Sequence, residues 1–240
     1  MDSAAKGEPD STEATGGRRG DMPDDAAPPG EAPELVLVKI CGLMREDDVT
    51  VLNEVHPDYV GFVFAPDSRR MIDLARALHL RGLLDHTITT VGVFVDQPVG
   101  DVADALLSGA IAVAQLHGDE DATYIEDLRD MAPDAMVIKA VQVADAAAIT
   151  AAAGCGADFL LLDAGLGQGR TFDWELINQA RAAGIDLPPF FLAGGLDADN
   201  VAAGIDVVRP YGVDVSSGVE TNHHKDPDKI RDFVAAARGA

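Results

Sequence analysis

The stretch KICGLMREDD, residues 39–48, joins the apolar run LVLVKI (35–40) to a charged segment with the pattern of a helix start. Cys41, one of only two cysteines in the chain, stands at the junction. An apolar strand followed by a loop and a helix is the unit of parallel α/β folds. The question is therefore how often this unit recurs.

Short apolar runs return at regular intervals after this first one. They are continuous rather than alternating, and they are rich in β-branched and aromatic residues, as is typical of strands buried on both faces of a parallel sheet. The eight runs are 35–40, 59–64, 90–95, 111–116, 136–140, 159–163, 190–194 and 212–216.

Segments with a helical pattern follow the first run and the third to eighth runs, and we interpret the whole as eight strand–helix units. Eight such units within residues 35–240 predict a compact (β/α)₈ barrel, the TIM-barrel fold. An open doubly wound sheet is the alternative fold. No GxGxxG motif follows the first run, which weakens that alternative.

Residues 1–34 differ in composition from the rest of the chain. They contain five Pro, five Gly and no Leu, Ile, Val or aromatic residue, so they cannot bury enough surface to offset the entropy of ordering. We predict a disordered acidic extension over 1–34 and a single catalytic domain over 35–240.

The net charge of the chain is −23, and only five of its 18 basic residues are lysines. Residues 1–34 hold nine acidic and three basic residues, so residues 35–240 still carry −17. Such a surface excludes nucleic acid as a natural partner and is typical of a salt-adapted protein, because salt screens the self-repulsion. An ordinary acidic protein is the alternative.

No apolar run is long enough to cross a membrane, and the N-terminus lacks the apolar core of a signal peptide. Two cysteines are too few for a disulfide scaffold. We therefore expect a cytoplasmic protein without a membrane partner.

In the predicted barrel, the residues that end each strand lie at the mouth where active sites are found. Cys41 follows the first strand, and its alternative role is that of a small buried packing residue. Asp163 ends the sixth strand, where partial desolvation would raise its pKa and suit a general acid. A helix-capping carboxylate is the alternative there. Cys155 precedes the sixth strand, at the opposite end, and is predicted to pack.

Anion-binding candidates follow three other strands. One of Arg69 and Arg70 could grip a substrate carboxylate with two parallel hydrogen bonds, and the other would then be a surface ion-pair partner. Small-residue loops follow the seventh and eighth strands, where such barrels usually bind phosphate. Their candidate residues are Gly194, Gly195, Ser217 and Gly218.

Gln115 and His117 end the fourth strand, and His117 is either a pocket residue or a structural histidine. His223 and His224 are adjacent rather than at metal-ligand spacing. We predict that the segment NHHKD around them is a solvated loop and that the chain holds no metal.

Seven segments together resemble one family: VKICGLMREDDV, GFVFAPDSRR, VGVFV, AQLHGDE, LLLDA…GRTFDW, LAGGLDADNV and DVSSGVE…KD. Their order and spacing over about residues 36–238 closely resemble phosphoribosylanthranilate isomerase of tryptophan biosynthesis.

The resemblance implies a (β/α)₈ barrel that isomerises N-(5-phosphoribosyl)anthranilate to 1-(2-carboxyphenylamino)-1-deoxyribulose 5-phosphate without cofactor or metal. It implies that Asp163 is the general acid and Cys41 the general base, a role helped by any cation that lowers the pKa of the thiol. It places Arg70 on the anthranilate carboxylate and the glycine loops on the phosphate. Asp214 becomes either a substrate contact or a support for the last loop.

Two related reactions are alternatives. An indole-glycerol-phosphate synthase-like lyase would need a catalytic lysine, and Lys39 and Lys139 are the only lysines in the predicted strands. A histidine-pathway sugar isomerase would carry aspartate where Cys41 stands. A non-catalytic binding module is a third alternative. The family includes monomers and dimers, so we expect a monomer or a homodimer. The loop AGLGQGRTFDW after Asp163 is shorter than in many family members.

Overall fold

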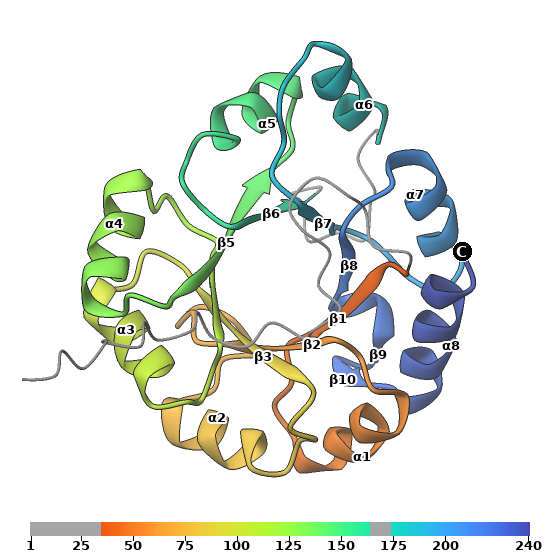
Figure 1. Ribbon diagram of the computed structural model, residues 1–240. Helices are drawn as coiled ribbons and strands as arrows, with labels where there is room; N and C mark the ends of the chain where they lie inside the picture. The colour runs from red at the N-terminus through yellow and green to blue at the C-terminus, as the bar shows by residue number, and fades with distance from the viewer. Residues whose placement is uncertain (1–34, 164–173) are drawn as a thin grey trace, which may run out of the picture.

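The computed structural model describes residues 35–163 and 174–240. Eight parallel strands pair in the order β1 to β8 and close on themselves, because β1 also pairs with β8. Figure 1 looks along the barrel and shows the helices as an outer ring around these strands. The predicted (β/α)₈ barrel is confirmed, and the alternative of an open sheet is wrong.

The barrel strands are β1 (Leu37–Cys41), β2 (Tyr59–Val63), β3 (Thr89–Phe94), β4 (Val113–Leu116), β5 (Met136–Gln142), β6 (Phe159–Asp163), β7 (Phe190–Leu192) and β8 (Gly212–Val215). The helices are α1 (Glu46–Val55), α2 (Leu74–Arg81), α3 (Val99–Leu107), α4 (Ala122–Met131), α5 (Ala146–Ala152), α6 (Glu175–Ala182), α7 (Val201–Val208) and α8 (Pro227–Arg238). All eight predicted strands are present, with ends moved by one or two residues. Helix α2 was not singled out from the sequence.

Alternate residues of each strand point into and out of the barrel. The outward residues and the inner faces of the helices form one large apolar cluster, against which the partly buried Cys155 packs as predicted. The inward residues form a second cluster, which includes Tyr59, Phe159, Phe191 and Tyr211. These rings meet edge-on or tilted, with centroids 5.1 to 6.1 Å apart, and fill the barrel on the side where the strands begin.

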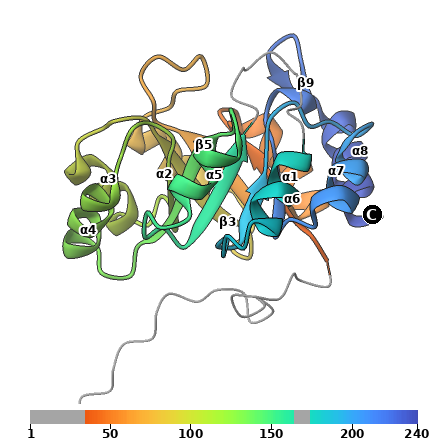
Figure 2. The ribbon, with the colours of Figure 1, turned by 90° about the horizontal axis from the view of Figure 1, so that it is seen from above.

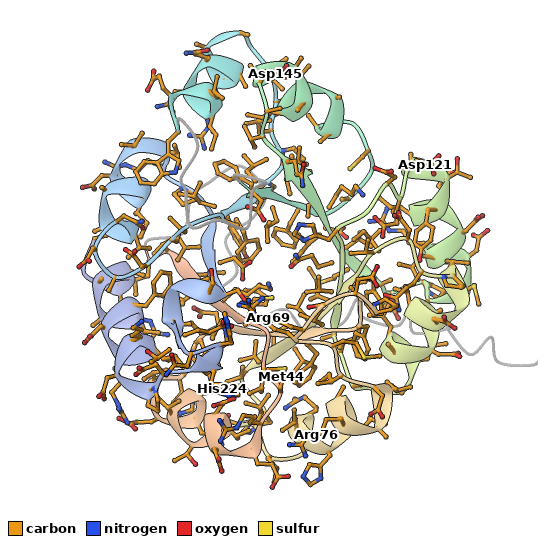
Figure 3. All side chains as sticks on the ribbon, turned by 180° about the vertical axis from the view of Figure 1, so that it is seen from behind. Met44, Arg69, Arg76, Asp121, Asp145 and His224 are labelled. Atoms are coloured by element: carbon orange, nitrogen blue, oxygen red, sulfur yellow. The ribbon has the colours of Figure 1, made fainter. Side chains whose placement is uncertain are left out.

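Aspartate caps fix the start of several helices. The carboxylates of Asp73, Asp121, Asp145 and Asp226 accept hydrogen bonds from backbone N–H groups in the first turns of α2, α4, α5 and α8. Such caps satisfy N–H groups that have no partner within the helix. Figure 3 shows Asp121 and Asp145 in the outer ring, away from the barrel opening. Part of the acidic composition is therefore structural.

A small hairpin follows the barrel between β8 and α8. The 3₁₀ turn η1 (Ser217–Val219) leads into β9 (Glu220–Thr221), which pairs antiparallel with β10 (His224–Lys225). Figure 2 shows β9 and the loop between β2 and α2 rising on the same side of the barrel. The prediction of a solvated loop for NHHKD is therefore wrong in part: His223 and His224 are exposed, but Lys225 is buried in the hairpin.

Two expectations fall on residues 1–34 and 164–173, which lie outside the described residues. They are the disordered extension and the short loop after Asp163. In the described part of the chain, none of the helices is long and apolar enough to span a membrane.

Candidate active site

Cys41 is the last residue of β1 and lies just inside the mouth of the barrel. Its side chain is buried together with Val63, Ala65 and Val93. The paired residue on β2 is Gly61, and a Cβ there would lie 2.7 Å from the Cys41 sulfur. The absence of a side chain on Gly61 therefore creates the space that the thiol occupies.

A buried ion pair lies on the same inward face, one step deeper than Cys41. Lys39 has no exposed surface, and its Nζ donates a 2.8 Å hydrogen bond to Oδ1 of Asp214, its register partner on β8. Burial opposes the charge on Lys39, but the attraction of Asp214 and Cys41 outweighs it and raises the pKa of Lys39. The ammonium group therefore remains charged inside the barrel.

The Cys41 thiol is protonated at neutral pH. Burial raises the pKa of Cys41 above its ordinary value, although Lys39 and, more weakly, Lys225 oppose this effect. Asp214 adds to the rise. A neighbouring cation does lower the pKa of the thiol, as expected, but desolvation is the larger effect in the site without substrate.

Asp163 ends β6 on the same mouth, three strands from β1 around the closed ring. Nε2 of His117, which follows β4, lies 3.8 Å from Oδ2 of Asp163. Burial lowers the pKa of His117 despite the attraction of Asp163, so the imidazole is neutral at pH 7. Nδ1 of His117 lies 3.2 Å from Nε2 of Gln115, whose buried Oε1 has no hydrogen-bond partner among the described residues.

Arg70 is held by a carboxylate that the sequence analysis did not consider. Its Nε and Nη2 donate hydrogen bonds of 2.6 and 2.8 Å to the two oxygens of Glu220 in β9. Arg69, which is half-exposed, and Lys225 bond the same carboxylate at 3.0 and 3.2 Å. Burial opposes the charge on Glu220, but Arg70 and Lys225 outweigh it and lower the pKa of Glu220 to about 2.

This cation cluster lies directly against the loop that follows Cys41. A Cβ on Gly42, which has φ +88°, would meet the Arg70 side chain, and Ser216 Oγ donates a 3.1 Å hydrogen bond to the Cys41 carbonyl oxygen. Lys225 donates to the Ser216 carbonyl oxygen at 2.8 Å. Among the residues labelled in Figure 3, Arg69 lies nearest the barrel opening.

The loops after β7 and β8 lie against each other. Gly194 and Gly195 have φ of +89° and +68°, which disfavours other residues there. A Cβ on Gly218 would collide with the carbonyl oxygen of Leu196, so the two loops can approach only because that position is glycine. Asn200 braces the first loop by donating a 2.9 Å hydrogen bond to the Gly195 carbonyl oxygen.

The predicted site residues lie at or after strand ends at one mouth, except Asp214, which lies inside β8 beside Lys39. The structure adds Glu220 and Lys225, which were not predicted, and gives Lys39 a place in the site. Lys39, Glu220 and Lys225 are all buried and charged. The signal for the two lysines in the sequence is the scarcity of lysine, and Glu220 has no such signal among the many acidic residues. Among the described residues, no group of three or more His, Cys, Asp or Glu side chains is placed to hold a metal ion.

Chemically, the mouth offers a buried thiol, a carboxyl group beside a neutral imidazole, and a cluster of cations. These groups suit proton transfer on an anionic substrate.

A model of the N-(5'-phosphoribosyl)anthranilate (PRA) isomerase family matches residues 38–236. The N-(5'-phosphoribosyl)anthranilate isomerase of Endomicrobium trichonymphae is 44% identical over 206 residues, which cover 84% of this chain and 98% of that protein. The enzyme of the same name from Lacticaseibacillus paracasei is 43% identical over 204 residues, covering 85% and 96%.

Solved structures of phosphoribosyl anthranilate isomerases also superpose on this chain. The phosphoribosyl anthranilate isomerase of Thermotoga maritima superposes with a TM-score of 0.78 at 37% identity, covering 86% of this chain and all of that one. A phosphoribosyl anthranilate isomerase in complex with reduced 1-(o-carboxyphenylamino)-1-deoxyribulose 5-phosphate superposes with a TM-score of 0.76, at the same identity and coverage. A third structure, at 37% identity, contains monomers generated from the dimeric Thermotoga maritima enzyme.

The match covers the whole barrel from β1 to α8, including the strand ends that carry the site. The lyase, the histidine-pathway isomerase and the binding module are therefore set aside. The chain belongs to the N-(5'-phosphoribosyl)anthranilate isomerase family.

Proposed function

We propose that Cys41 is the general base and Asp163 the general acid of this enzyme. The chain is an isomerase that converts N-(5'-phosphoribosyl)anthranilate to 1-(2-carboxyphenylamino)-1-deoxyribulose 5-phosphate in tryptophan biosynthesis. The observation that supports the two roles is the position of both side chains at one mouth, on strands that are not neighbours. A substrate lying across the mouth can therefore meet an acid on one side and a base on the other.

The two proposed residues act in two successive proton transfers, and the enolamine then gains a proton on C1′ and loses one from its hydroxyl. Asp163 donates a proton to the ribose ring oxygen, and the ring opens to a Schiff base in which the anilinic nitrogen is positively charged. Cys41 then removes the proton on C2′, which gives an enolamine that tautomerises to the ketone. The imidazole of His117 lies 3.8 Å from Asp163 and is neutral, so it places no positive charge beside the carboxyl group.

The raised pKa of Cys41 agrees with this sequence of events. The thiol is protonated before substrate binds, and it must pass this proton to solvent water before it can accept the C2′ proton. The positive Schiff base formed after ring opening favours the resulting thiolate. The base is therefore generated where and when the C2′ proton becomes acidic.

Arg70 is proposed to bind the anthranilate carboxylate. Glu220 neutralises only one of the three cations around it, so Arg69, Arg70 and Lys225 leave an excess positive charge at the mouth. An arginine already fixed by a bidentate carboxylate loses little side-chain freedom when a second anion binds.

The phosphate is proposed to lie on the backbone N–H groups of Gly194, Gly195, Ser217 and Gly218. The close packing of the two loops supports this proposal, because it brings their N–H groups together without a lysine. The Gly195 carbonyl oxygen is engaged by the side-chain amide of Asn200.

The test of the two catalytic roles is an isomerase assay with purified protein and N-(5'-phosphoribosyl)anthranilate in molar potassium chloride, following the loss of substrate fluorescence. Cys41→Ala and Asp163→Asn are each expected to lower kcat by at least about 10³-fold, since each removes a general catalyst. Cys155→Ala is the matched cysteine control. A folded Cys41→Ala variant that keeps most of its activity contradicts the role of the thiol.

The cellular location, the salt adaptation and the oligomeric state of the protein are also proposals. Two free cysteines and the tryptophan pathway suit the cytoplasm. The acidic, lysine-poor composition suits a salt-adapted host. The chain is a monomer or a homodimer, and sedimentation of the purified protein distinguishes the two.

A further inference from the structure

The Lys39–Asp214 pair is a buried, charged feature of the barrel that the acid–base mechanism above does not use. Lys39 is fully buried and Asp214 is nearly so. Their hydrogen bond joins the side chains of β1 and β8, the two strands whose pairing closes the barrel. Replacing such a pair by apolar residues is often neutral or stabilising. Stability alone is therefore a weak reason for placing it there.

The pair lies next to the thiol. Because side chains alternate along a strand, Lys39 and Cys41 share the inward face of β1, with Lys39 one layer deeper. An ammonium group has three N–H donors, of which Asp214 accepts one, and the Lys39 side chain also interacts with Cys41. The aromatic rings that fill the barrel below prevent the ammonium from reaching water on that side.

We propose that Lys39 and Asp214 are positioning residues for the isomerisation: Lys39 stabilises the thiolate of Cys41, and Asp214 holds Lys39 charged and in place. This inference rests on the proposed role of Cys41 as the base. Once the substrate has closed the mouth, the water that would otherwise stabilise a thiolate is excluded. A fixed ammonium below the sulfur then replaces that water.

Other charged groups face the same region from neighbouring elements. Asp214 on β8 opposes the thiolate, and Lys225 on β10 favours it. His117, directly after β4, interacts with both members of the pair. Arg70 lies over Gly42, with its charge matched by Glu220. Lys39 makes the largest favourable contribution to the thiolate among these groups.

The experiment measures the thiolate directly. In a Cys155→Ala background, where Cys41 is the sole cysteine, the rate of iodoacetamide alkylation is followed from pH 6 to 11. The midpoint is the pH at which the alkylation rate of Cys41 reaches half its maximum. Lys39→Met is expected to raise this midpoint by about 1–3 pH units, the usual effect of losing a neighbouring charge. Asp214→Asn is also expected to raise the midpoint, because the buried Lys39 loses the carboxylate that holds it charged and in place.

Two further variants serve as controls. Lys139→Met removes another strand lysine, which pairs with Glu120 at 2.9 Å, and is expected to leave the midpoint unchanged. The double variant Lys39→Met/Asp214→Asn leaves no lone buried charge, so it keeps the test available if Lys39→Met does not fold. The alkylation midpoint of the double variant is expected to lie above that of the Cys155→Ala protein in which Lys39 and Asp214 are intact.

The pH profile of kcat/KM is measured in parallel. If the midpoint and the alkaline limb of the profile both rise in Lys39→Met, Lys39 acts through the thiolate. An unchanged midpoint in a folded Lys39→Met or double variant overturns the inference, whatever the activity. An active Cys41→Ala variant overturns the proposed role of Cys41 as the base instead. The alkylation midpoint still tests whether Lys39 stabilises the thiolate, because it does not depend on activity.

Discussion

Gly61 determines where the sulfur of Cys41 can lie. A Cβ at this position would be 2.7 Å from the sulfur and 3.1 Å from the Cys41 Cα. Gly61→Ala must therefore displace the thiol or the strand, and a misplacement of about 1 Å costs about 10²-fold in rate. We expect kcat to fall by about 10- to 100-fold, with a loss of about 1–3 kcal/mol in unfolding free energy from overpacking.

Gly100→Ala is the matched control for this prediction. Gly100 lies in α3, and a Cβ there would meet only the end of Met131 at 3.8 Å. Alanine in a helix is favoured over glycine by about 0.5–1 kcal/mol, so this variant is expected to be slightly more stable and fully active. Steady-state kinetics and urea unfolding of both variants decide the matter, and equal kcat values would contradict the role given to Gly61.

At the scale of elements, the hairpin β9–β10 fixes the anion-binding end of the mouth. Glu220 and Lys225 are register partners in it, and Glu220 also holds Arg70. The folded pKa of Glu220 is about 2, below its ordinary value near 4.5. Its contribution to stability is therefore complete above about pH 4.5 and is lost as pH falls from about 4.5 to about 2.

Glu220→Gln is expected to lose about 2 kcal/mol of unfolding free energy at pH 7, after allowance for solvent screening. The difference from the unmodified protein should shrink as pH falls toward 2, and KM should rise because Arg70 loses its anchor. Urea unfolding at pH 7 and at pH 3 measures the first effect. Glu46→Gln, which removes an exposed partner of Arg76, should show a much smaller loss. A pH-independent deficit for Glu220→Gln would argue against the charge network.

The elements themselves were largely predictable, and their side-chain partners were not. Buried parallel strands are continuous apolar runs, so all eight could be found in the sequence. Two-residue strands such as β9 and β10 have no periodicity to detect, and α2 is one short helix behind a loop. The positions of Cys41 and Asp163 followed from strand ends. The partners of Lys39 and Arg70 lie 175 and 150 residues away, and only the closed fold brings them together.

At the scale of the whole molecule, charge is the dominant feature. Residues 35–240 carry a net charge of −17, and repulsion among like charges destabilises a compact chain. The Debye length falls from about 10 Å at 0.1 M salt to about 3 Å at 1 M, so salt should relieve most of this repulsion below about 1 M.

We therefore expect Tm to rise by roughly 5–10 °C between 0.1 and 1 M potassium chloride and then to level off, which corresponds to a few kcal/mol for a chain of this size. Differential scanning calorimetry across that range measures the effect. Choline chloride at equal ionic strength should reproduce it, and sucrose should not reproduce the plateau. A Tm that is flat or falls with potassium chloride would favour an ordinary acidic protein over a salt-adapted one.

Most of the few lysines are buried, which limits where the protein can be labelled. Within residues 35–163 and 174–240, Lys39, Lys139 and Lys225 are buried or nearly so, and Lys229 is the one exposed lysine. Reagents and enzymes that acylate primary amines therefore have a single ready target in this part of the chain. The Nζ of Lys229 is bonded to the Glu220 carbonyl oxygen at 2.8 Å. A label attached there would report on the hairpin that fixes the mouth, without touching the catalytic groups.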